Sequence, residues 1–350
     1  MPIRRWIAVG FSYALLVFLA GPIQSATISG LFIFGDSLSD PGNNAISFGS
    51  TASPPYHVTL QGEITSNSFI PDYPYATSYQ YSNSDVWAYQ FATMLGLPSQ
   101  VAGPALGGGV GGNYAFGGAT TGPLNNVGIP SLLTQAAIFE SSLGTNPAPA
   151  GALYVIAGGG NNARAALTAI AGGADAAATI AATSVQFAAD VGAIVDSLQS
   201  KGAHDFVVWD VANLGLTPAI SVSGPVPSAL ATLLSQSMNA ALAQRLASET
   251  NVHTFDLFAL LTAVNADPAA YGLTNVTDAV GAVPGADLSK YLCWDGIHPT
   301  AAGHAILASS MYTLVTSVPE IDPTGCGSVV AMVVGCVGLL ERRRARASVA

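Results

Sequence analysis

Hydrophobic positions follow two patterns that alternate along the chain. Short hydrophobic runs that end in glycine or in polar residues predict buried strands within 28–36, 152–157, 205–209 and 252–257. Between and after these runs, hydrophobic residues recur at helical spacing, as at Phe187, Val191, Ile194 and Leu198. Strands that alternate with helices imply βαβ units, so the pattern predicts an α/β fold around a mainly parallel sheet.

One segment breaks this alternation. Residues 41–112 are rich in Gly, Pro, Ser, Asn and Tyr, and they hold a single predicted short helix, at 85–95. Long loops in compact domains are often functional. In open parallel sheets, ligands bind beyond the carboxyl ends of the strands. We therefore expect the chemistry of this chain at its strand ends and in its loops.

Both ends of the chain carry the patterns of processing segments. At the N-terminus, Arg4 and Arg5 precede a hydrophobic run at 6–20 and small residues up to Ala26. This three-part pattern predicts a secretory signal at 1–26, and the alternative is a short membrane anchor. The run is shorter than a bilayer span needs, which favours a signal that is cleaved near Ala26.

At the C-terminus, a hydrophobic stretch at 325–340 ends in an arginine cluster, which holds that end of such a segment in the cytoplasm. Together with the motif VPE at 318–320, these features resemble a PEP-CTERM sorting signal of Gram-negative bacteria. Ile321 replaces the usual second proline, as in the variant form seen in planctomycetes. The resemblance implies a sorting signal at 318–346 and recognition by an exosortase-type membrane protease. The alternative is a plain membrane anchor.

The domain expected between these segments, 27–317, is acidic. It holds seventeen Asp and Glu residues against four basic residues, a net charge of −13, which leaves no basic patch for nucleic acid. Cys293 is its only cysteine, which excludes an internal disulfide, and no Cys or His cluster has metal-ligand spacing. We expect an exported protein of the cell envelope, cell surface or extracellular space. It is transiently anchored by its C-terminal segment, contacts the membrane through its termini only, and has no metal or cofactor.

The stretch FIFGDSLSD ends the first predicted strand and places Ser37 in a turn. A serine hydroxyl is a poor nucleophile unless a base takes its proton, and the base needs a partner that fixes its tautomer. The motif WDGIHPT offers His298 and, three residues earlier, Asp295, on a turn where the carboxylate reaches Nδ1. The alternative for such a pair is an ordinary surface turn. The polar residues around the serine are expected to build its own turn: Asp36, Asp40 and Asn43.

Negative charge that develops on a reacting carbonyl oxygen requires hydrogen-bond donors. NYAFGGAT offers the backbone amides of Gly117 and Gly118, and AGGGNN offers Asn161 just after a strand. The alternative for Asn161 is a helix N-cap. Residues 107–112 match G-x-G-x-x-G, but no strand precedes them and no acid follows at the distance that a dinucleotide site needs. They predict a flexible loop.

The order and spacing of these motifs resemble the SGNH (GDSL) hydrolase family: FGDSLSDPGN, NYAFGGAT, GGGNN and DGIHPT. The G-x-S-x-G elbow of the α/β-hydrolases is absent. The resemblance covers about 31–314, and it implies a three-layer α/β/α sandwich with a mainly parallel central sheet and a flavodoxin-like architecture. It implies that Ser37 is the nucleophile, His298 the base and Asp295 the carboxylate that orients the base.

The same resemblance implies an oxyanion hole formed by the backbone N–H of Ser37, the backbone N–H of Gly118 and the side-chain amide of Asn161. Gly117 is the alternative glycine. Asn162 stands where the family usually has an aspartate. It can form hydrogen bonds but carries no charge, so support of the site at this position does not follow from the sequence, and we expect the protein to remain active.

The expected function is that of an exported carboxylic ester hydrolase, similar to GDSL lipases and acylhydrolases, with an acyl-enzyme on Ser37. One alternative is a carbohydrate (acetyl) esterase that acts on surface or extracellular polysaccharide. A second alternative is a non-catalytic surface binding protein of the same fold. Tyrosines of the long loop either stack on sugars or pack the loop: Tyr56, Tyr73, Tyr75, Tyr79 and Tyr81.

Overall fold

The computed structural model describes residues 28–47, 58–60, 62–97, 103–105, 111–123 and 128–317. These residues belong to one compact unit, Ile28–Val318. The predicted secretory signal at 1–26 and the predicted sorting signal at 318–346 lie outside the described residues, as does most of the glycine-rich stretch at 107–112. Those three assignments stay predictions.

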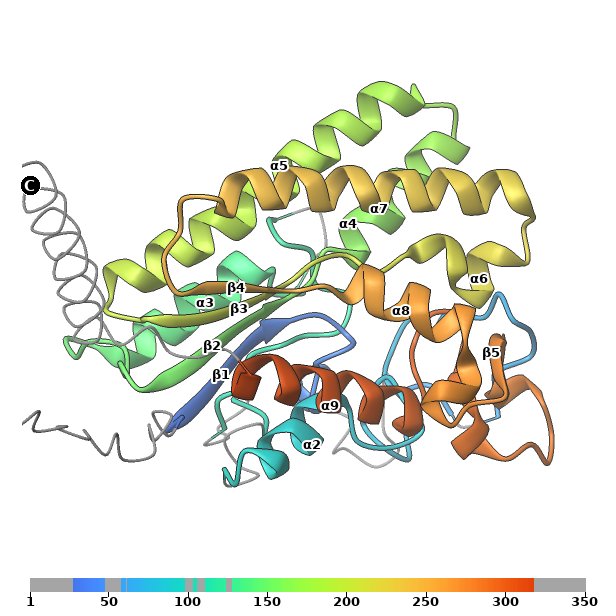
Figure 1. The fold of residues 1–350 in the computed structure, drawn as a ribbon, viewed down its shortest axis with the longest axis horizontal. Coiled ribbons are helices and arrows are strands. Elements are labelled where there is room, and N and C mark those ends of the chain that lie inside the picture. The colour runs from blue at the N-terminus through green and yellow to red at the C-terminus, as the bar shows by residue number, and fades with distance from the viewer. Residues whose placement is uncertain are drawn as a thin grey trace, which may run out of the picture. The chain divides into compact units, whose positions relative to one another are not determined.

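The centre of the domain is a parallel sheet with the strand order β1-β2-β3-β4 (Figure 1). In-register neighbours run across it, from Phe32 to Tyr154, from Tyr154 to Phe206 and from Phe206 to Val252. The four strands lie inside the four predicted runs, which confirms the predicted fold class. Their bounds are β1 Gly30–Gly35, β2 Ala152–Ala157, β3 Asp205–Trp209 and β4 Val252–Phe255.

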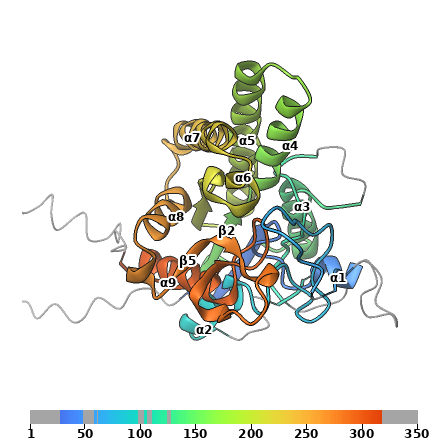
Figure 2. The ribbon, with the colours of Figure 1, turned by 90° about the vertical axis from the view of Figure 1, so that its right-hand side faces the viewer.

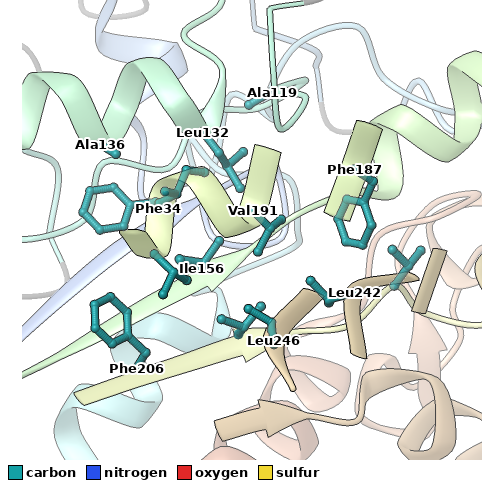
Figure 3. Packing of buried hydrophobic residues seen from close by; sticks show 14 of the residues in the cluster. Phe34, Ala119, Leu132, Ala136, Ile156, Phe187, Val191, Phe206, Leu242 and Leu246 are labelled. Carbon is teal, nitrogen blue, oxygen red and sulfur yellow. The ribbon is translucent and has the colours of Figure 1, made fainter. Parts of the chain in front are cut away.

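Side chains that alternate along each strand face two separate layers of helices. On one face, Phe34, Ile156 and Phe206 share a buried cluster with residues of four helices (Figure 3). These helices are α3 Leu132–Leu143, α4 Gly160–Ala171, α5 Ala176–Ser200 and α7 Pro225–Leu246. Burial on both faces explains why the sequences of β1, β2 and β3 are nearly continuous hydrophobic runs rather than alternating ones. The prediction of a buried strand was wrong for β4, which lies at the end of the strand order and exposes His253 and Thr254.

The opposite face of the sheet carries Ile33, Val155 and Trp209, which share a second buried cluster with three further helices. Figure 2 shows the sheet between the two layers, which completes a three-layer sandwich. The helices on this side are α2 Trp87–Met94, α8 Leu257–Ala266 and α9 Ala301–Ser317. The Thr300 hydroxyl accepts a hydrogen bond from the Gly303 amide at 3.1 Å, as expected for an N-cap of α9.

Helix α5 is the one helix of the described residues that is long and apolar enough to cross a membrane by length and composition. Phe187, Val191 and Ile194 of α5 are fully or almost fully buried in the core against the sheet and α7. A core helix of this length passes the same test, so the helix is explained by its place in the sandwich.

Most of the remaining elements belong to the C-terminal half of the domain sequence. A second, two-stranded parallel sheet pairs Asn275 with Tyr291 and Ala279 with Cys293, and it leads directly into the segment that carries the candidate histidine. The elements are β5 Asn275–Ala279, β6 Tyr291–Cys293, the short helices α1 Asn43–Ser47 and α6 Pro218–Ser221, and the 3-10 turns Leu214–Leu216, Pro268–Tyr271, Val280–Ala282 and Leu288–Lys290.

The free edge of β1 is covered by a segment that the sequence pattern did not mark as extended. The Ile33 amide donates to the Gly112 carbonyl at 3.0 Å, and the Tyr114 amide donates to the Ile33 carbonyl at 2.7 Å. Two residues further on, the Phe116 amide donates to the Gly35 carbonyl at 3.0 Å. This irregular pairing carries the chain along β1 and delivers Gly117 and Gly118 to the carboxyl end of that strand.

Candidate active site

Ser37 lies two residues beyond β1, at the carboxyl edge of the sheet. The Asp36 amide extends the ladder by one bond to the Ala157 carbonyl at 3.3 Å, and the chain then turns. Gln135 of α3 holds the turning point, because its side chain accepts from the Gly35 amide at 2.8 Å and donates to the Gly35 carbonyl at 2.9 Å. A Cβ at Gly35 would lie 2.8 Å from the Ala157 carbonyl oxygen, so only glycine fits.

The Asp40 carboxylate braces the serine loop from inside. It accepts from the backbone amides of Gly42 at 2.8 Å, Asn43 at 2.7 Å and Gly117 at 2.8 Å. Burial raises the pKa of Asp40 to about 6, against these backbone hydrogen bonds, which favour the charged form. The carboxylate thus ties the loop after β1 to the glycine loop that runs alongside it.

Three side chains form a continuous hydrogen-bonded chain beyond the sheet edge. The Ser37 Oγ lies 2.8 Å from the His298 Nε2, and the His298 Nδ1 lies 2.7 Å from the Asp295 Oδ2. All three residues are buried, with Ser37 the most exposed at 8%. The structure therefore brings together the predicted nucleophile, base and orienting acid across 261 positions of the chain.

The turn that carries His298 is built by the same aspartate that binds the imidazole. The Asp295 Oδ1 accepts from the backbone amides of Ile297 at 2.9 Å and His298 at 2.8 Å. A Cβ at Gly296 would lie 2.6 Å from the Phe69 carbonyl oxygen, which explains the glycine inside the motif. Because one oxygen fixes the backbone and the other faces the ring, the imidazole is aimed at Ser37 before any substrate binds.

Tyr75 is a member of the site that sequence reasoning did not find. Its hydroxyl donates to the Asp295 Oδ2 at 2.8 Å, its ring packs edge-on against Trp294, and the residue is fully buried. Burial, followed by the negative charge of Asp295, raises the pKa of Tyr75 above its ordinary value, so the phenol stays a proton donor. Tyr75 was one of five loop tyrosines, and no spacing signal separated it from the others.

The two loop glycines have different tasks in the structure. The Gly117 amide donates to Asp40, and a Cβ at Gly117 would overlap the ring of Tyr81. Gly118 adopts a φ of 81°, which favours glycine, and it lines a cavity together with Ser37 and His298. Of the two, Gly118 is therefore the residue placed beside the serine.

Asn161 also lines this cavity and lies in the first turn of α4. The helix begins at Gly160 and its N-cap is Gly159, so Asn161 is not the cap that the alternative interpretation expected. Its Nδ2 donates to the Ala119 carbonyl at 2.8 Å. An amide nitrogen carries two hydrogens, so a bond to an oxyanion can form while the bond to Ala119 stays in place.

Asn162 supports the glycine loop through neutral hydrogen bonds. Its Oδ1 accepts from the Thr121 amide at 3.0 Å, and its Nδ2 donates to the Thr121 hydroxyl at 3.0 Å. The Thr121 hydroxyl in turn donates to the Asp190 carboxylate at 2.8 Å. Position 162 is neutral, but a buried carboxylate reaches the same threonine from α5. The site therefore has a charged support that comes from a different helix.

Two cavities meet at Ser37. The smaller one, about 90 Å³, has apolar walls that include Leu214, Ile220, Leu257 and Leu261. The larger one, about 350 Å³, is mainly polar and is lined by Asp72, Thr120 and Thr168, among others. No group of three or more His, Cys, Asp or Glu residues within the described ranges could hold a metal ion.

A buried serine linked to a histidine and an aspartate, beyond the carboxyl edge of a parallel sheet, is the arrangement of a serine-dependent hydrolase. Comparison with known proteins identifies the family. Residues 31–311 match the family model of the GDSL-like lipases/acylhydrolases, and the chain belongs to this family. Membership of this family supports an ester hydrolase.

Several curated proteins are similar to the chain. An uncharacterized protein of Pseudomonas putida is 26% identical over 352 residues, which cover 91% of this chain and 53% of that protein. Esterase EstA of Pseudomonas aeruginosa is 32% identical over 136 residues, 34% of this chain and 21% of the esterase. A GDSL esterase/lipase of Arabidopsis thaliana is 24% identical and covers 86% of this chain and 94% of its own length. The chain thus spans about half the first relative and a fifth of EstA.

Solved structures of similar proteins include a G-D-S-L family lipolytic protein from Veillonella parvula and an extracellular lipase from Streptomyces rimosus. The first has 13% identity and a TM-score of 0.41 and covers 83% of this chain and 99% of that chain. The second has 18% identity and the same TM-score and coverage.

Proposed function

We propose that this protein hydrolyses carboxylic esters through an acyl-enzyme on Ser37. One observation carries the proposal, namely the hydrogen-bonded chain from the Ser37 Oγ through both nitrogens of His298 to Asp295. A serine becomes a nucleophile when a neutral imidazole accepts its proton, and a fixed carboxylate stabilises the imidazolium that forms. This chain has both parts, already in contact.

In the first step, the Ser37 Oγ attacks the ester carbonyl carbon while its proton passes to the His298 Nε2. The tetrahedral oxyanion lies against the N–H groups of Ser37 and Gly118 and the Asn161 amide. When the intermediate collapses, the bond to the alcohol oxygen breaks and the alcohol leaves with the proton from His298. In the second step, water attacks the acyl carbon while His298 takes its proton. The bond to the Ser37 Oγ then breaks, His298 returns the proton to Ser37, and the acid leaves.

The two cavities suggest how the ester lies. The cavity with leucine and isoleucine walls beside Ser37 fits the acyl chain, because most of its lining is apolar. The larger polar cavity then receives the alcohol portion. The modest volume of the apolar cavity favours short acyl chains over long ones.

We also propose that the protein is exported and that an exosortase-type membrane protease processes its C-terminus. The support is the sequence pattern at the two termini. Expression of the full chain with an exosortase should yield a product shortened at its C-terminus. An unshortened product, found only in the cytoplasm, would contradict this part of the proposal.

The catalytic proposal is tested with p-nitrophenyl butyrate and a fluorophosphonate probe. The wild-type protein is expected to hydrolyse the ester and to take up one equivalent of probe, and Ser37→Ala is expected to do neither above background. Ser39→Ala is the matched control, because Ser39 is a buried serine of the same loop whose hydroxyl accepts from the Trp87 indole N–H at 3.0 Å. Labelling that survives in a folded Ser37→Ala protein would overturn the proposal. A panel that includes acetylated glycans separates the carbohydrate esterase alternative.

A further inference from the structure

Four residues line both cavities at the candidate site, namely Ser37, Asn161, Arg164 and His298. Ser37, Asn161 and His298 have roles in the proposed reaction, whereas Arg164 has none. Arg164 lies on α4, one turn beyond the oxyanion residue Asn161, and it is only partly exposed. A cation is therefore placed where the apolar and polar cavities meet.

The charge of Arg164 is poorly compensated by the protein. For comparison, Arg245 lies 2.6 Å from carboxylate oxygens of both Asp196 and Glu249. Among the described residues, no carboxylate lies within ion-pair distance of Arg164. Burial lowers the pKa of Arg164, and the more distant charges of Asp295, Asp36 and Asp72 oppose that effect. An arginine is protonated throughout the working pH range, so the site holds a positive charge with unused donors.

Helix stability does not explain this placement. Cations are favourable near the C-terminus of a helix, whereas Arg164 lies close to the N-terminal, positive end of α4. The guanidinium and the helix end therefore add to a positive potential in the polar cavity. Asp72 lines the same cavity, but its side chain is exposed, and solvent screens such a charge.

We propose that Arg164 binds an anionic group, a carboxylate or a phosphate, on the alcohol portion of the ester substrate. The inference rests on the proposed function, because it assigns the substrate class of the same site. A guanidinium offers paired N–H donors that match both anions, and such charge-assisted bonds are stronger than neutral ones. Since Arg164 lines both cavities, the anionic group lies within a few bonds of the scissile ester.

A competing explanation is that Arg164 positions Asn161. The Arg164 Nη1 lies 3.5 Å from the Asn161 Oδ1, which is long for a hydrogen bond. The two explanations predict different kinetics. A positioning residue affects every ester equally, whereas an anion-binding residue affects only esters that carry the anion.

The experiment compares kcat/KM for two matched pairs of short-chain esters. One pair is monobutyrylglycerol and its 3-phosphate, and the other is O-butyryl lactamide and O-butyryl lactate. The wild-type protein is expected to prefer the charged member of at least one pair by about 10- to 100-fold, and the pair identifies the anion. Arg164→Gln should abolish that preference and keep the neutral members within about threefold of wild type. Arg164→Lys should retain part of the preference.

Lys201→Gln is the control for net charge, because Lys201 is exposed at the end of α5 and should leave all four rates unchanged. The inference is overturned if the wild-type protein prefers neither charged ester, or if Arg164→Gln lowers charged and neutral substrates by the same factor. Failure of the proposed function has a different signature, since neither neutral ester would then be hydrolysed and the fluorophosphonate would not label Ser37.

Discussion

Two buried aspartates organise the two tight turns that meet at the candidate site, and they do so differently. Both oxygens of Asp40 are used on backbone amides, including those of Asn43 and Gly117, so the residue only holds loops. In Asp295, by contrast, Oδ1 accepts hydrogen bonds from backbone amides, and Oδ2 bonds to the side chains of His298 and Tyr75. The same side chain thus becomes part of the chemistry when one of its oxygens is left for a side-chain partner.

The largest expected effect on kcat comes from replacing Asp295, whose Oδ2 contacts the imidazole of His298. In Asp295→Asn, the amide can keep the turn through its oxygen but no longer stabilises a charged His298, so kcat should fall about 10³- to 10⁴-fold. Steady-state hydrolysis of p-nitrophenyl butyrate measures the loss. Asp40→Asn is the matched comparison. It should lower the melting temperature by roughly 3–10 °C, since buried amides lose their acceptor, with less than about a tenfold change in kcat. The reverse ranking of the two variants in kcat would contradict the division of tasks.

A medium effect is expected at Tyr75. Tyr75→Phe removes one donor from the Asp295 Oδ2 and leaves the aromatic packing on Trp294 intact, so kcat should fall about 3- to 10-fold at unchanged KM. Because Tyr75 acts through Asp295, the low-field proton resonance of the His298–Asp295 hydrogen bond should also shift. Tyr154→Phe is the control, since its hydroxyl donates to the Pro149 carbonyl in another part of the domain. If the resonance does not shift in Tyr75→Phe, the conclusion that Tyr75 acts through Asp295 is wrong and the residue only packs against its neighbours.

The smallest effect concerns stability and pH at the serine turn. Burial raises the pKa of Asp36 from 3.8 to about 6. The folded state therefore binds the proton more tightly, and the contribution of Asp36 to the unfolding free energy falls as pH rises from about 4 to 6. Above pH 6, the buried charge costs on the order of 2–3 kcal/mol. The melting temperature of Asp36→Asn, relative to wild type, should thus be a few degrees higher at pH 8 than at pH 5.

His304 titrates in the same window with the opposite sign, because burial lowers its pKa to about 3 and the unfolded chain then binds the extra proton. His304 is present in both proteins, so it cancels from the difference in melting temperature. Calorimetry at the two pH values checks the prediction, and a difference that does not change with pH would contradict the assignment to Asp36.

Much of the fold was predictable because its signals are local. Hydrophobic runs and helical spacing located the four strands of the main sheet, and glycine-bounded motifs located Ser37 and Asn161. The covering of β1 by 112–116 was not predictable, because its irregular pairing leaves no two-residue period in the sequence. The role of Tyr75 at the site could not be predicted for a related reason. Its only distinguishing feature is a contact with a residue 220 positions away.

Gly117 and Gly118 show the limit of motif reasoning. Adjacent glycines are indistinguishable in the sequence, and their tasks separate only when Asp40 takes one amide and Tyr81 fills the space beside it. The residue at 162 shows the same limit. The sequence did not establish what supports the site where Asn162 replaces the usual aspartate. In the structure, Asp190 reaches the same loop through Thr121 from a helix that no local pattern connects to it.

The separation of Ser37 from His298 has a consequence for when the protein can act. The serine lies just after the first strand of the domain and the histidine just before its last helix, 261 positions later. During synthesis, the serine emerges long before its base exists in folded form. The hydroxyl therefore stays inert until almost the whole domain has closed around it. The proposed esterase activity would therefore be detectable only in chains whose folding is nearly complete.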